Sequence, residues 1–181
     1  MKDSSTIYCF PTKEESAVFR TLRPDADVRE VGVGMASAGA MAAIWISAFG
    51  PKRIVLCGIA GACDESLQVG QVVEVVSDSV AGLPEAYAEE YVANTTGKLP
   101  QANTLTVSHT GDALPYIAKD ASLPYIEQME GAGVAIACKE LDVEFYHVRA
   151  ISNRVGDDRS EWRINEAVTA LGAVVAQLFK E

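Results

Sequence analysis

The feature that most constrains the fold is an apolar run at residues 54–60 (IVLCGIA), in which polar and apolar residues do not alternate. A strand with one face in water shows such alternation, whereas a strand covered by helices on both faces does not. The run therefore predicts a buried strand in an α/β fold with a parallel or mixed sheet. Shorter runs that are apolar or rich in β-branched residues, each bounded by turn residues, predict further strands at 7–10, 28–33, 72–76, 105–107 and 145–151.

Helical patterns of apolar residues lie between these strands, at 13–22, 36–49, 126–141 and 161–179. The last is the clearest, because its apolar residues fall at three- and four-residue steps and form one stripe. A Ser or Asp within 157–160 is a candidate cap for this helix. Glycines and prolines punctuate the polar stretch 81–103, where we expect a surface excursion.

Composition excludes several classes of protein. A chain of 181 residues, 49% of them hydrophobic, is long enough for one domain over residues 1–181 with a full core. No segment reaches the roughly 18 apolar residues of a membrane span, and no basic region leads into an apolar run at the start, so we expect a cytoplasmic protein without a membrane partner. The formal charge of −10 opposes binding to nucleic acid. Four cysteines lie in or beside apolar runs without zinc spacing and are predicted to be reduced thiols: Cys9, Cys57, Cys63 and Cys138.

Glu130 is the first candidate for chemistry. It follows Gln128 and Met129 and heads a predicted helical stretch with small residues at 131, 132, 133 and 135. Two ribose hydroxyls can donate to such a carboxylate, and these bonds strengthen when a sugar becomes cationic in a transition state. A glutamate at a helix N-terminus also commonly does no more than complement the helix dipole. The small residues favour the first interpretation, because they let the helix approach another backbone closely.

Two further positions carry suitable polar groups. Asn153 follows the predicted strand 145–151, at the end of a sheet where α/β proteins bind ligands. Its carboxamide suits N7–H and the 6-oxo group of a hypoxanthine leaving group, although Asn is also a common turn residue. Glu14 and Glu15 lie in the first turn of a predicted helix, where one could orient a nucleophilic water or both could compensate the dipole.

Motifs for other kinds of site are absent or incomplete. The glycines of 32–39 resemble a dinucleotide fingerprint, but Ser37 occupies the third glycine position. The two histidines have no partner at a zinc spacing, so no metal site is expected. Neither a serine-hydrolase elbow nor a phosphate-binding loop with Gly-Lys-Ser/Thr occurs. We expect His147 and Trp162 to be packing residues.

The order and spacing of these segments resemble the nucleoside phosphorylase and nucleosidase superfamily, and within it the futalosine hydrolases most closely. The similar segments are the acidic first turn and residues 32–39, 58–78, 110–113 and 128–162. The resemblance implies a twisted central mixed sheet in three α/β/α layers. It also implies no cofactor, a small purine nucleoside as ligand, and a homo-oligomer of two or more subunits.

Carried over to this sequence, the resemblance implies that Glu15 positions water, Glu130 holds the ribose hydroxyls and Asn153 engages the base. Asn153 stands where methylthioadenosine and adenosylhomocysteine nucleosidases have aspartate, which favours a 6-oxopurine. The expected reaction hydrolyses futalosine to hypoxanthine and dehypoxanthine futalosine, in menaquinone biosynthesis, through a ribosyl cation-like transition state. Further substrate contacts are implied for Ile59, Ala60, Gly61, Gln128, Met129 and Leu114.

Three alternatives stay open. The first is a methylthioadenosine/adenosylhomocysteine nucleosidase. The second is a purine nucleoside phosphorylase, although the glycine-rich loops offer no Arg-Ser pair for phosphate. The third is a nucleoside-binding relative without turnover, because the chain is shorter than most members between residues 78 and 126, where relatives build loops that cover the base and the sugar substituent.

Overall fold

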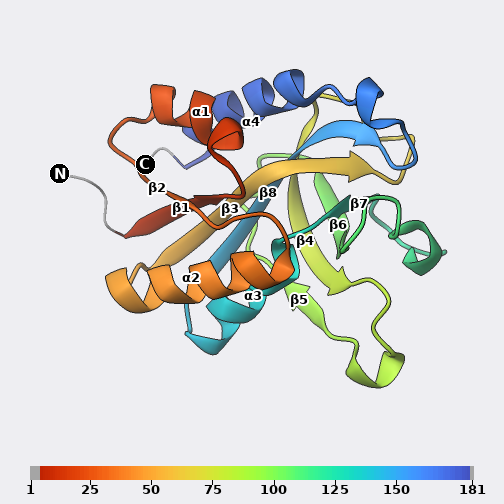
Figure 1. Ribbon diagram of the computed structural model, residues 1–181, viewed down its shortest axis with the longest axis horizontal. Helices are drawn as coiled ribbons and strands as arrows, with labels where there is room; N and C mark the ends of the chain where they lie inside the picture. Colours follow the sequence, from red (N-terminus) through yellow and green to blue (C-terminus); the bar gives the residue numbers. More distant parts are fainter. Residues whose placement is uncertain (1–4, 180–181) are drawn as a thin grey trace.

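Residues 5–179, the part of the chain that the computed structural model describes, form a twisted mixed sheet between two layers of helices (Figure 1). The strands of this part are β1 Thr6–Phe10, β2 Asp27–Glu30, β3 Arg53–Ala62, β4 Val72–Val80, β5 Glu90–Val92, β6 Gln101–Thr106, β7 Tyr125–Gln128 and β8 Glu144–Arg154. The α-helices are α1 Lys13–Leu22, α2 Met35–Phe49, α3 Gly131–Glu140 and α4 Ile164–Leu178, and the 3-10 helices are η1 Glu85–Tyr87, η2 Leu114–Tyr116 and η3 Arg159–Glu161. The predicted α/β class is confirmed. The predicted domain 1–181 includes residues 1–4 and 180–181, which lie outside the described part, so its extent stays a prediction.

The strand β3 lies between the two helical layers. Val55 and Cys57 belong to an apolar cluster with residues of α1 and α4, whereas Ile54 and Leu56 belong to a second cluster with residues of α2 and α3. Successive side chains of a strand point to opposite faces, so both faces of β3 are covered. This arrangement explains why the sequence of the strand lacks alternation.

Five of the strands form a closed ring of pairings. The strand β3 pairs in parallel with β8, β8 pairs antiparallel with β4, β4 runs parallel to β6 and β6 to β7, and β7 pairs antiparallel with the last residues of β3. A shift in register between Ala60 and Gly61 accompanies the change of partner along β3. A third apolar cluster draws residues from all five strands. The ring brings the ends of β3, β7 and β8 together.

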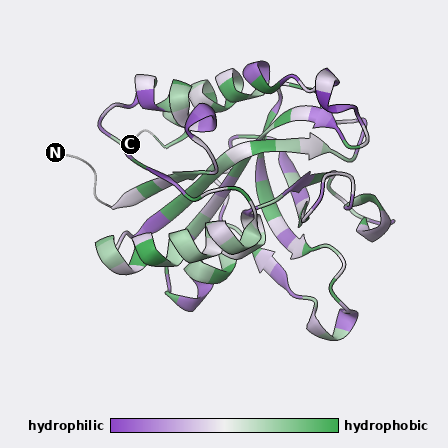
Figure 2. Cartoon of the chain, in the orientation of Figure 1, coloured by the Kyte–Doolittle hydropathy of each residue, from purple (hydrophilic) through white to green (hydrophobic). Residues whose placement is uncertain are grey.

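The helix α2 packs against α3 at two glycines. A Cβ on Gly133 would lie 2.2 Å from the carbonyl oxygen of Met35, and one on Gly39 would lie 3.0 Å from the carbonyl oxygen of Gly133. The backbones of α2 and α3 can approach each other this closely only because glycine has no side chain at either position. Figure 2 shows α2 green to pale along its length, in keeping with a sequence that has no charged residue from Met35 to Phe49.

The helix predicted at 126–141 begins too early, and this prediction is wrong at its start. Residues Tyr125–Gln128 form β7, which pairs with β6 and with the end of β3, and α3 begins at Gly131 after Glu130 as its cap residue. Pairing with strands that are distant in the sequence overrides the local helical pattern. Glu130 therefore lies at the head of α3, as the sequence indicated.

Two other boundaries also differ from the predictions. The strand β8 extends to Arg154, so Asn153 lies within the strand and not beyond it. The predicted surface excursion at 81–103 contains β5 and the first residues of β6, both of which pair with β4. Hydrogen bonds to β4 stabilise strands in this segment, although it is polar and interrupted by turn residues.

The predicted cap of the last helix is wrong. Asp158 accepts a hydrogen bond from the N–H of Ser160 at 2.9 Å and forms a capping box with Glu161, but this box caps η3. The helix α4 begins later, at Ile164, and its cap residue Arg163 makes no side-chain capping bond. The segment 155–163 therefore forms a separate turn between β8 and α4. None of the helices in the described part is long and apolar enough to cross a membrane.

Candidate active site

A cavity of about 360 Å³ lies where the ends of β3, β7 and β8 meet the first turns of α1 and α3. This volume falls within the range of pockets that hold small molecules. The cavity is lined by residues from segments far apart in the sequence: Pro11, Thr12, Glu14, Glu15, Val33, Ile59, Ala60, Gly61, Val107, Thr110, Glu127, Gln128, Met129, Glu130, Arg149, Ser152, Asn153, Arg159, Trp162 and Ile164.

The structure brings the three predicted catalytic residues to this one cavity. Glu15 comes from α1, Glu130 from the head of α3, and Asn153 from β8. Five of the predicted substrate contacts line the same cavity, namely Ile59, Ala60, Gly61, Gln128 and Met129. Leu114 is the exception, because it lies in η2 with half of its surface exposed and is not part of the lining.

Glu15 is held by two donors. The N–H of Ile59 donates to Oε1 at 3.0 Å, and the hydroxyl of Thr12 donates to Oε2 at 3.1 Å. Thr12 also caps α1 by accepting from the N–H of Glu15. Burial raises the pKa of Glu15, while the Ile59 hydrogen bond and the charge of Arg149 lower it. The result is a fixed carboxylate whose basicity exceeds that of an exposed glutamate, which suits a group that accepts a proton from water.

Glu130 is buried, and its carboxylate joins three elements. The N–H of Gly34, at the start of α2, donates to Oε1 at 3.0 Å, and Nη1 of Arg149 donates to Oε2 at 3.2 Å. The side chains of Glu130 and Arg149 are 5% and 1% exposed, so this ion pair is shielded from water. Each carboxylate oxygen has more than one acceptor site, so lone pairs of Glu130 stay available to a ligand.

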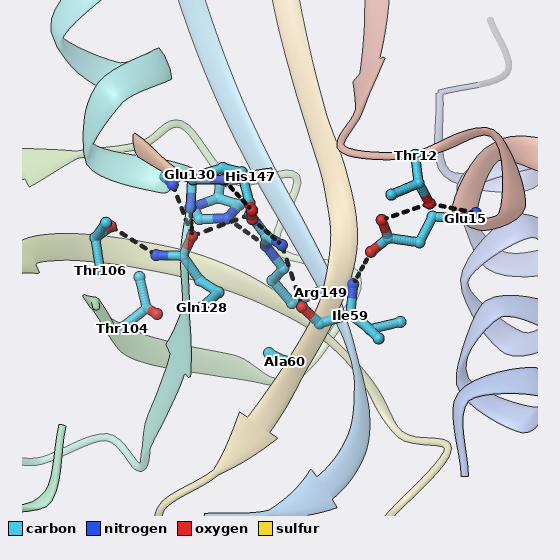
Figure 3. A network of polar contacts seen from close by, with 12 residues as sticks. Thr12, Glu15, Ile59, Ala60, Thr104, Thr106, Gln128, Glu130, His147 and Arg149 are labelled. Carbon is cyan, nitrogen blue, oxygen red and sulfur yellow. Dashed lines mark hydrogen bonds and ion pairs between the residues drawn. The ribbon is translucent and has the colours of Figure 1, made fainter. Parts of the chain in front are cut away.

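Arg149 is the centre of the polar network beneath the cavity (Figure 3). Its Nε donates to Nε2 of His147 at 2.7 Å, Nη2 donates to Oε1 of Gln128 at 3.0 Å, and Nη1 also donates to the carbonyl oxygen of Ile59 at 3.1 Å. A Cβ on Gly58 would lie 2.4 Å from Nη1, so only glycine leaves room for the guanidinium there. Because Ile59 contacts Arg149 through its carbonyl and Glu15 through its N–H, the network links the surroundings of the two acids.

Gln128 supports the head of α3. Its Oε1 accepts from the N–H groups of Glu130 and Gly131 at 2.8 and 2.6 Å, and its Nε2 donates to the Thr106 hydroxyl at 2.8 Å and to Asp78 at 3.1 Å. Burial raises the pKa of Asp78 to about 7, against hydrogen bonds from Thr106 and Gln128 that lower it. Both ends of the Gln128 side chain are therefore engaged inside the protein.

His147 is a core residue, as predicted, but one of its nitrogens is unpaired. Nε2 accepts from Arg149, so the ring proton resides on Nδ1, which is buried without a hydrogen-bond partner among residues 5–179. Burial first, and then the charge of Arg149, lower the pKa of His147 well below its ordinary value. The imidazole is therefore neutral and acts as an acceptor for the guanidinium.

Asn153 is buried beside Gly61. Its Oδ1 accepts from the hydroxyl of Ser152 at 2.8 Å, and its Nδ2 donates to the carbonyl oxygen of Arg154 at 2.8 Å. A Cβ on Gly61 would lie 3.1 Å from Nδ2, so the glycine lets the carboxamide lie close to β3. One N–H and further acceptor capacity of the carboxamide stay available at the cavity wall.

Sequence comparisons identify relatives of this chain. Residues 11–83 match the sequence model of the phosphorylase superfamily. The chain is 29% identical over 180 residues to a futalosine hydrolase of Thermus thermophilus, which covers 84% of this chain and 80% of that protein. It is 36% identical over 103 residues to a futalosine hydrolase of Streptomyces coelicolor, which covers 55% and 44%. The resemblance to the phosphorylase superfamily is confirmed.

Solved structures show that the fold is shared with proteins of this kind. The 5'-methylthioadenosine/S-adenosylhomocysteine nucleosidase of Helicobacter pylori, with butyl-thio-DADMe-Immucillin-A, superposes with a TM-score of 0.83 at 12% identity, covering 96% of both chains. The native futalosine hydrolase of Helicobacter pylori gives a TM-score of 0.81 at 12% identity, covering 94% of both chains. At these identities the likeness concerns the fold alone.

The sequence analysis did not predict several of the residues that line the cavity. Trp162, predicted as a packing residue, lines it, and the Arg159 guanidinium lies 4.1 Å from the centre of the Trp162 ring. Arg149 could have been found, because a charged residue inside an apolar strand requires a buried partner. Glu127 is also part of the lining. Burial raises its pKa, while N–H groups of Gly111 and Ala113 lower it.

The described residues 5–179 contain no cluster of three or more His, Cys, Asp or Glu side chains that could hold a metal ion. The four cysteines are not paired with one another, and three of them, Cys9, Cys57 and Cys138, are buried. The polar side-chain groups that line the cavity are carboxylates, two carboxamides, hydroxyls, two guanidinium groups and the indole N–H of Trp162.

Proposed function

We propose that this chain is a purine nucleosidase that hydrolyses the N-ribosidic bond of a 6-oxopurine nucleoside, with futalosine as the preferred substrate. The futalosine hydrolase and nucleosidase relatives support the general class, a nucleoside N-glycosyl hydrolase. The observation that carries the proposal is the convergence of Glu15, Glu130 and Asn153 on one cavity. The same convergence supports a small purine nucleoside as the ligand.

Each residue has a distinct part in the proposed reaction. As the bond from C1′ to N9 breaks, its electron pair passes to the purine, which takes up a proton at N7 from a solvent water. The carboxamide oxygen of Asn153 accepts a hydrogen bond from the resulting N7–H. Glu130 accepts hydrogen bonds from ribose hydroxyls, and its charge stabilises the developing sugar cation. Water attacks C1′ and gives a proton to Glu15. The products are the free base and the free sugar.

The polar network fixes the carboxylate of Glu130 at the cavity. The Arg149 guanidinium and the Gly34 N–H each donate a hydrogen bond to one of its oxygens. These two donors use only part of the acceptor capacity of the Glu130 carboxylate, so ribose hydroxyls can donate to the sites that remain. This arrangement supports a function that depends on electrostatic stabilisation of a sugar cation.

The experiment is a product assay with the purified chain. Futalosine, inosine and methylthioadenosine are each incubated with it, with and without phosphate, and the free base and the sugar product are followed by chromatography. We expect hypoxanthine from futalosine without phosphate. A requirement for phosphate would indicate a phosphorylase, adenine from methylthioadenosine alone would indicate the other nucleosidase class, and tight binding without any free base would indicate a relative without turnover. Each of these outcomes contradicts the proposal.

A further inference from the structure

Glu127 is a buried carboxylate at the cavity that the proposed reaction does not use. It lies in the middle of β7, is 4% exposed, and pairs across the strands with Gly61. Its Oε1 accepts from the N–H of Gly111 at 2.7 Å, and its Oε2 accepts from the N–H of Ala113 at 3.3 Å. The carboxylate therefore holds the loop after β6 against the cavity, where Thr110 is part of the lining.

Glu127 and Asn153 are neighbours. The point that a Cβ of Gly61 would occupy lies 3.1 Å from Nδ2 of Asn153 and 3.4 Å from Cγ of Glu127. Both side chains thus border the same small volume, from β8 and β7 on either side of β3. A base that contacts the carboxamide of Asn153 is within reach of the carboxylate.

The carboxylate has acceptor capacity left for a ligand. An ionised carboxylate offers about four acceptor sites and no donor, and the two loop N–H groups occupy one site on each oxygen. The remaining sites call for a donor on the ligand. An acceptor placed there would face an unpaired negative charge in a buried place, which is costly.

We propose that Glu127 reads the N1 position of the purine and selects 6-oxopurines over 6-aminopurines. This inference rests on the proposed function and adds the residue that sets its base preference. In hypoxanthine the atom next to the 6-oxo carbon is N1–H, a donor that matches the carboxylate. In adenine N1 is an acceptor, which the carboxylate of Glu127 repels. The carboxamide of Asn153 carries both an acceptor and a donor, whereas a carboxylate carries acceptors alone, so Glu127 supplies the discrimination that an amide lacks.

The test compares inosine with adenosine in the intact chain and in Glu127→Gln. The amide of glutamine can present a donor to N1 of adenine, so the ratio of kcat/KM for inosine over adenosine should fall by at least about tenfold. The matched control is Asp112→Asn, which removes one carboxylate charge from the loop that Glu127 holds, at a side chain that is 55% exposed and outside the cavity lining. The control should keep the ratio of the natural chain.

A role limited to holding the loop gives a different result. If Glu127→Gln lowers kcat/KM for both nucleosides by the same factor and the ratio is unchanged, the inference is overturned. A second measurement needs no variant: N1-methylinosine lacks the donor, so the natural chain should hydrolyse it at least about tenfold more slowly than inosine. Equal rates for the two would also overturn the inference.

Failure of the proposed function can be told apart from failure of this inference. If the natural chain cleaves none of the nucleosides, the proposed function fails, and calorimetry with free hypoxanthine and adenine still reports base selection. A preference for hypoxanthine that is lost in Glu127→Gln supports the role of Glu127 without any turnover. Equal affinities for the two bases in the natural chain contradict it.

Discussion

Glu15 and Glu130 are both buried acids, but their surroundings differ in charge. Glu130 has a guanidinium partner, whereas Glu15 is held by the neutral N–H of Ile59 and the hydroxyl of Thr12. A buried acid without an ionic partner has a raised pKa and a greater ability to accept a proton. We therefore propose different tasks for the two acids, proton transfer for Glu15 and hydrogen bonding to the ribose hydroxyls for Glu130.

Replacing Glu15 by glutamine should abolish activity without loss of stability. The amide keeps an acceptor for the Ile59 N–H but cannot take a proton from water, so we expect kcat to fall by at least about 100-fold. The melting temperature should be unchanged or higher, because burial disfavours the carboxylate. Steady-state kinetics and thermal unfolding are the measurements, with Glu140→Gln, at an exposed position in α3, as the charge-matched control. A variant that retains most of its activity would remove Glu15 from the mechanism.

Glu130→Gln should lower both activity and stability. Loss of the charge facing the sugar should reduce kcat by about 100- to 1000-fold, and the buried Arg149 would be left without its counter-ion. Breaking a buried ion pair from one side costs about 3–5 kcal/mol of unfolding free energy. Urea unfolding and kinetics under conditions where the variant is folded separate the two effects. An unchanged unfolding free energy would show that the pair with Arg149 does not form in solution.

At the residue scale, the motifs of the sequence predicted three candidate residues but not the polar network around them. Glu15, Glu130 and Asn153 were identified from resemblance, and the structure brings them to one cavity. Arg149 lies in the same recognised segment, yet its contacts with His147 and Gln128 depend on the register of β8 against β3 and on the position of β7. Such contacts depend on the pairing of distant strands and are not visible in local patterns.

At the scale of elements, predictions were best where local pattern and tertiary environment agree. The helix α1 begins and ends as predicted, because its acidic first turn, its Thr12 cap and its apolar residues all favour the same element. The start of α3 was wrong because residues 126–128 have a helical pattern of side chains but pair with β6. Local propensity does not reveal this pairing, because the paired residues of β6 lie more than twenty residues earlier in the chain.

The close contact of α2 and α3 gives a prediction for Gly133→Ala. The new Cβ would lie 2.2 Å from the backbone oxygen of Met35, and backbone atoms cannot move aside as a flexible side chain can. Overpacking of this kind costs about 1–3 kcal/mol, which for a chain of this length lowers the melting temperature by about 2–4 °C per kcal/mol. Thermal unfolding measures the effect, and Ser47→Ala, at an exposed position of α2, is the control. Equal melting temperatures would mean that the helices lie further apart than the structure shows.

At the scale of the whole molecule, closure of the strand ring decides where the site forms. The pairing of β7 with the end of β3 brings Glu127 opposite Gly61 and sets the head of α3 beside the first turn of α1. The strands β3, β4, β6 and β8 could be predicted at least in part from their own residues, whereas β7 could not. The antiparallel contact that closes the ring joins strands separated by more than sixty residues. The position of the cavity therefore follows from topology rather than from any single motif.

The stability of the whole fold should depend on pH through Asp78, which lies buried under α3. Its folded pKa of about 7 exceeds the ordinary value of 3.8, so the folded state favours the protonated acid. Such a group contributes stability that is present below pH 4 and is lost as the pH rises toward 7. The effect of His147 has the opposite sign, because its pKa in the folded protein is lowered. Its contribution to stability is present above the ordinary pKa of histidine and is lost as the pH falls below that pKa. The pH profile of the natural chain is the sum of these effects.

Asp78→Asn isolates the contribution of this acid. Asparagine keeps an acceptor for Thr106 and Gln128 but has no charge, so the unfolding free energy of the variant relative to the natural chain should rise between pH 4 and pH 7 by up to roughly 4 kcal/mol. Urea unfolding of both proteins at several pH values measures this difference, and Asp25→Asn, with an exposed side chain, should show none of it. The contribution of His147 is common to both proteins and cancels in the difference. Parallel profiles for the natural chain and Asp78→Asn would mean that Asp78 is ionised in the fold throughout this range, and that the network around Gln128 accommodates its charge without cost.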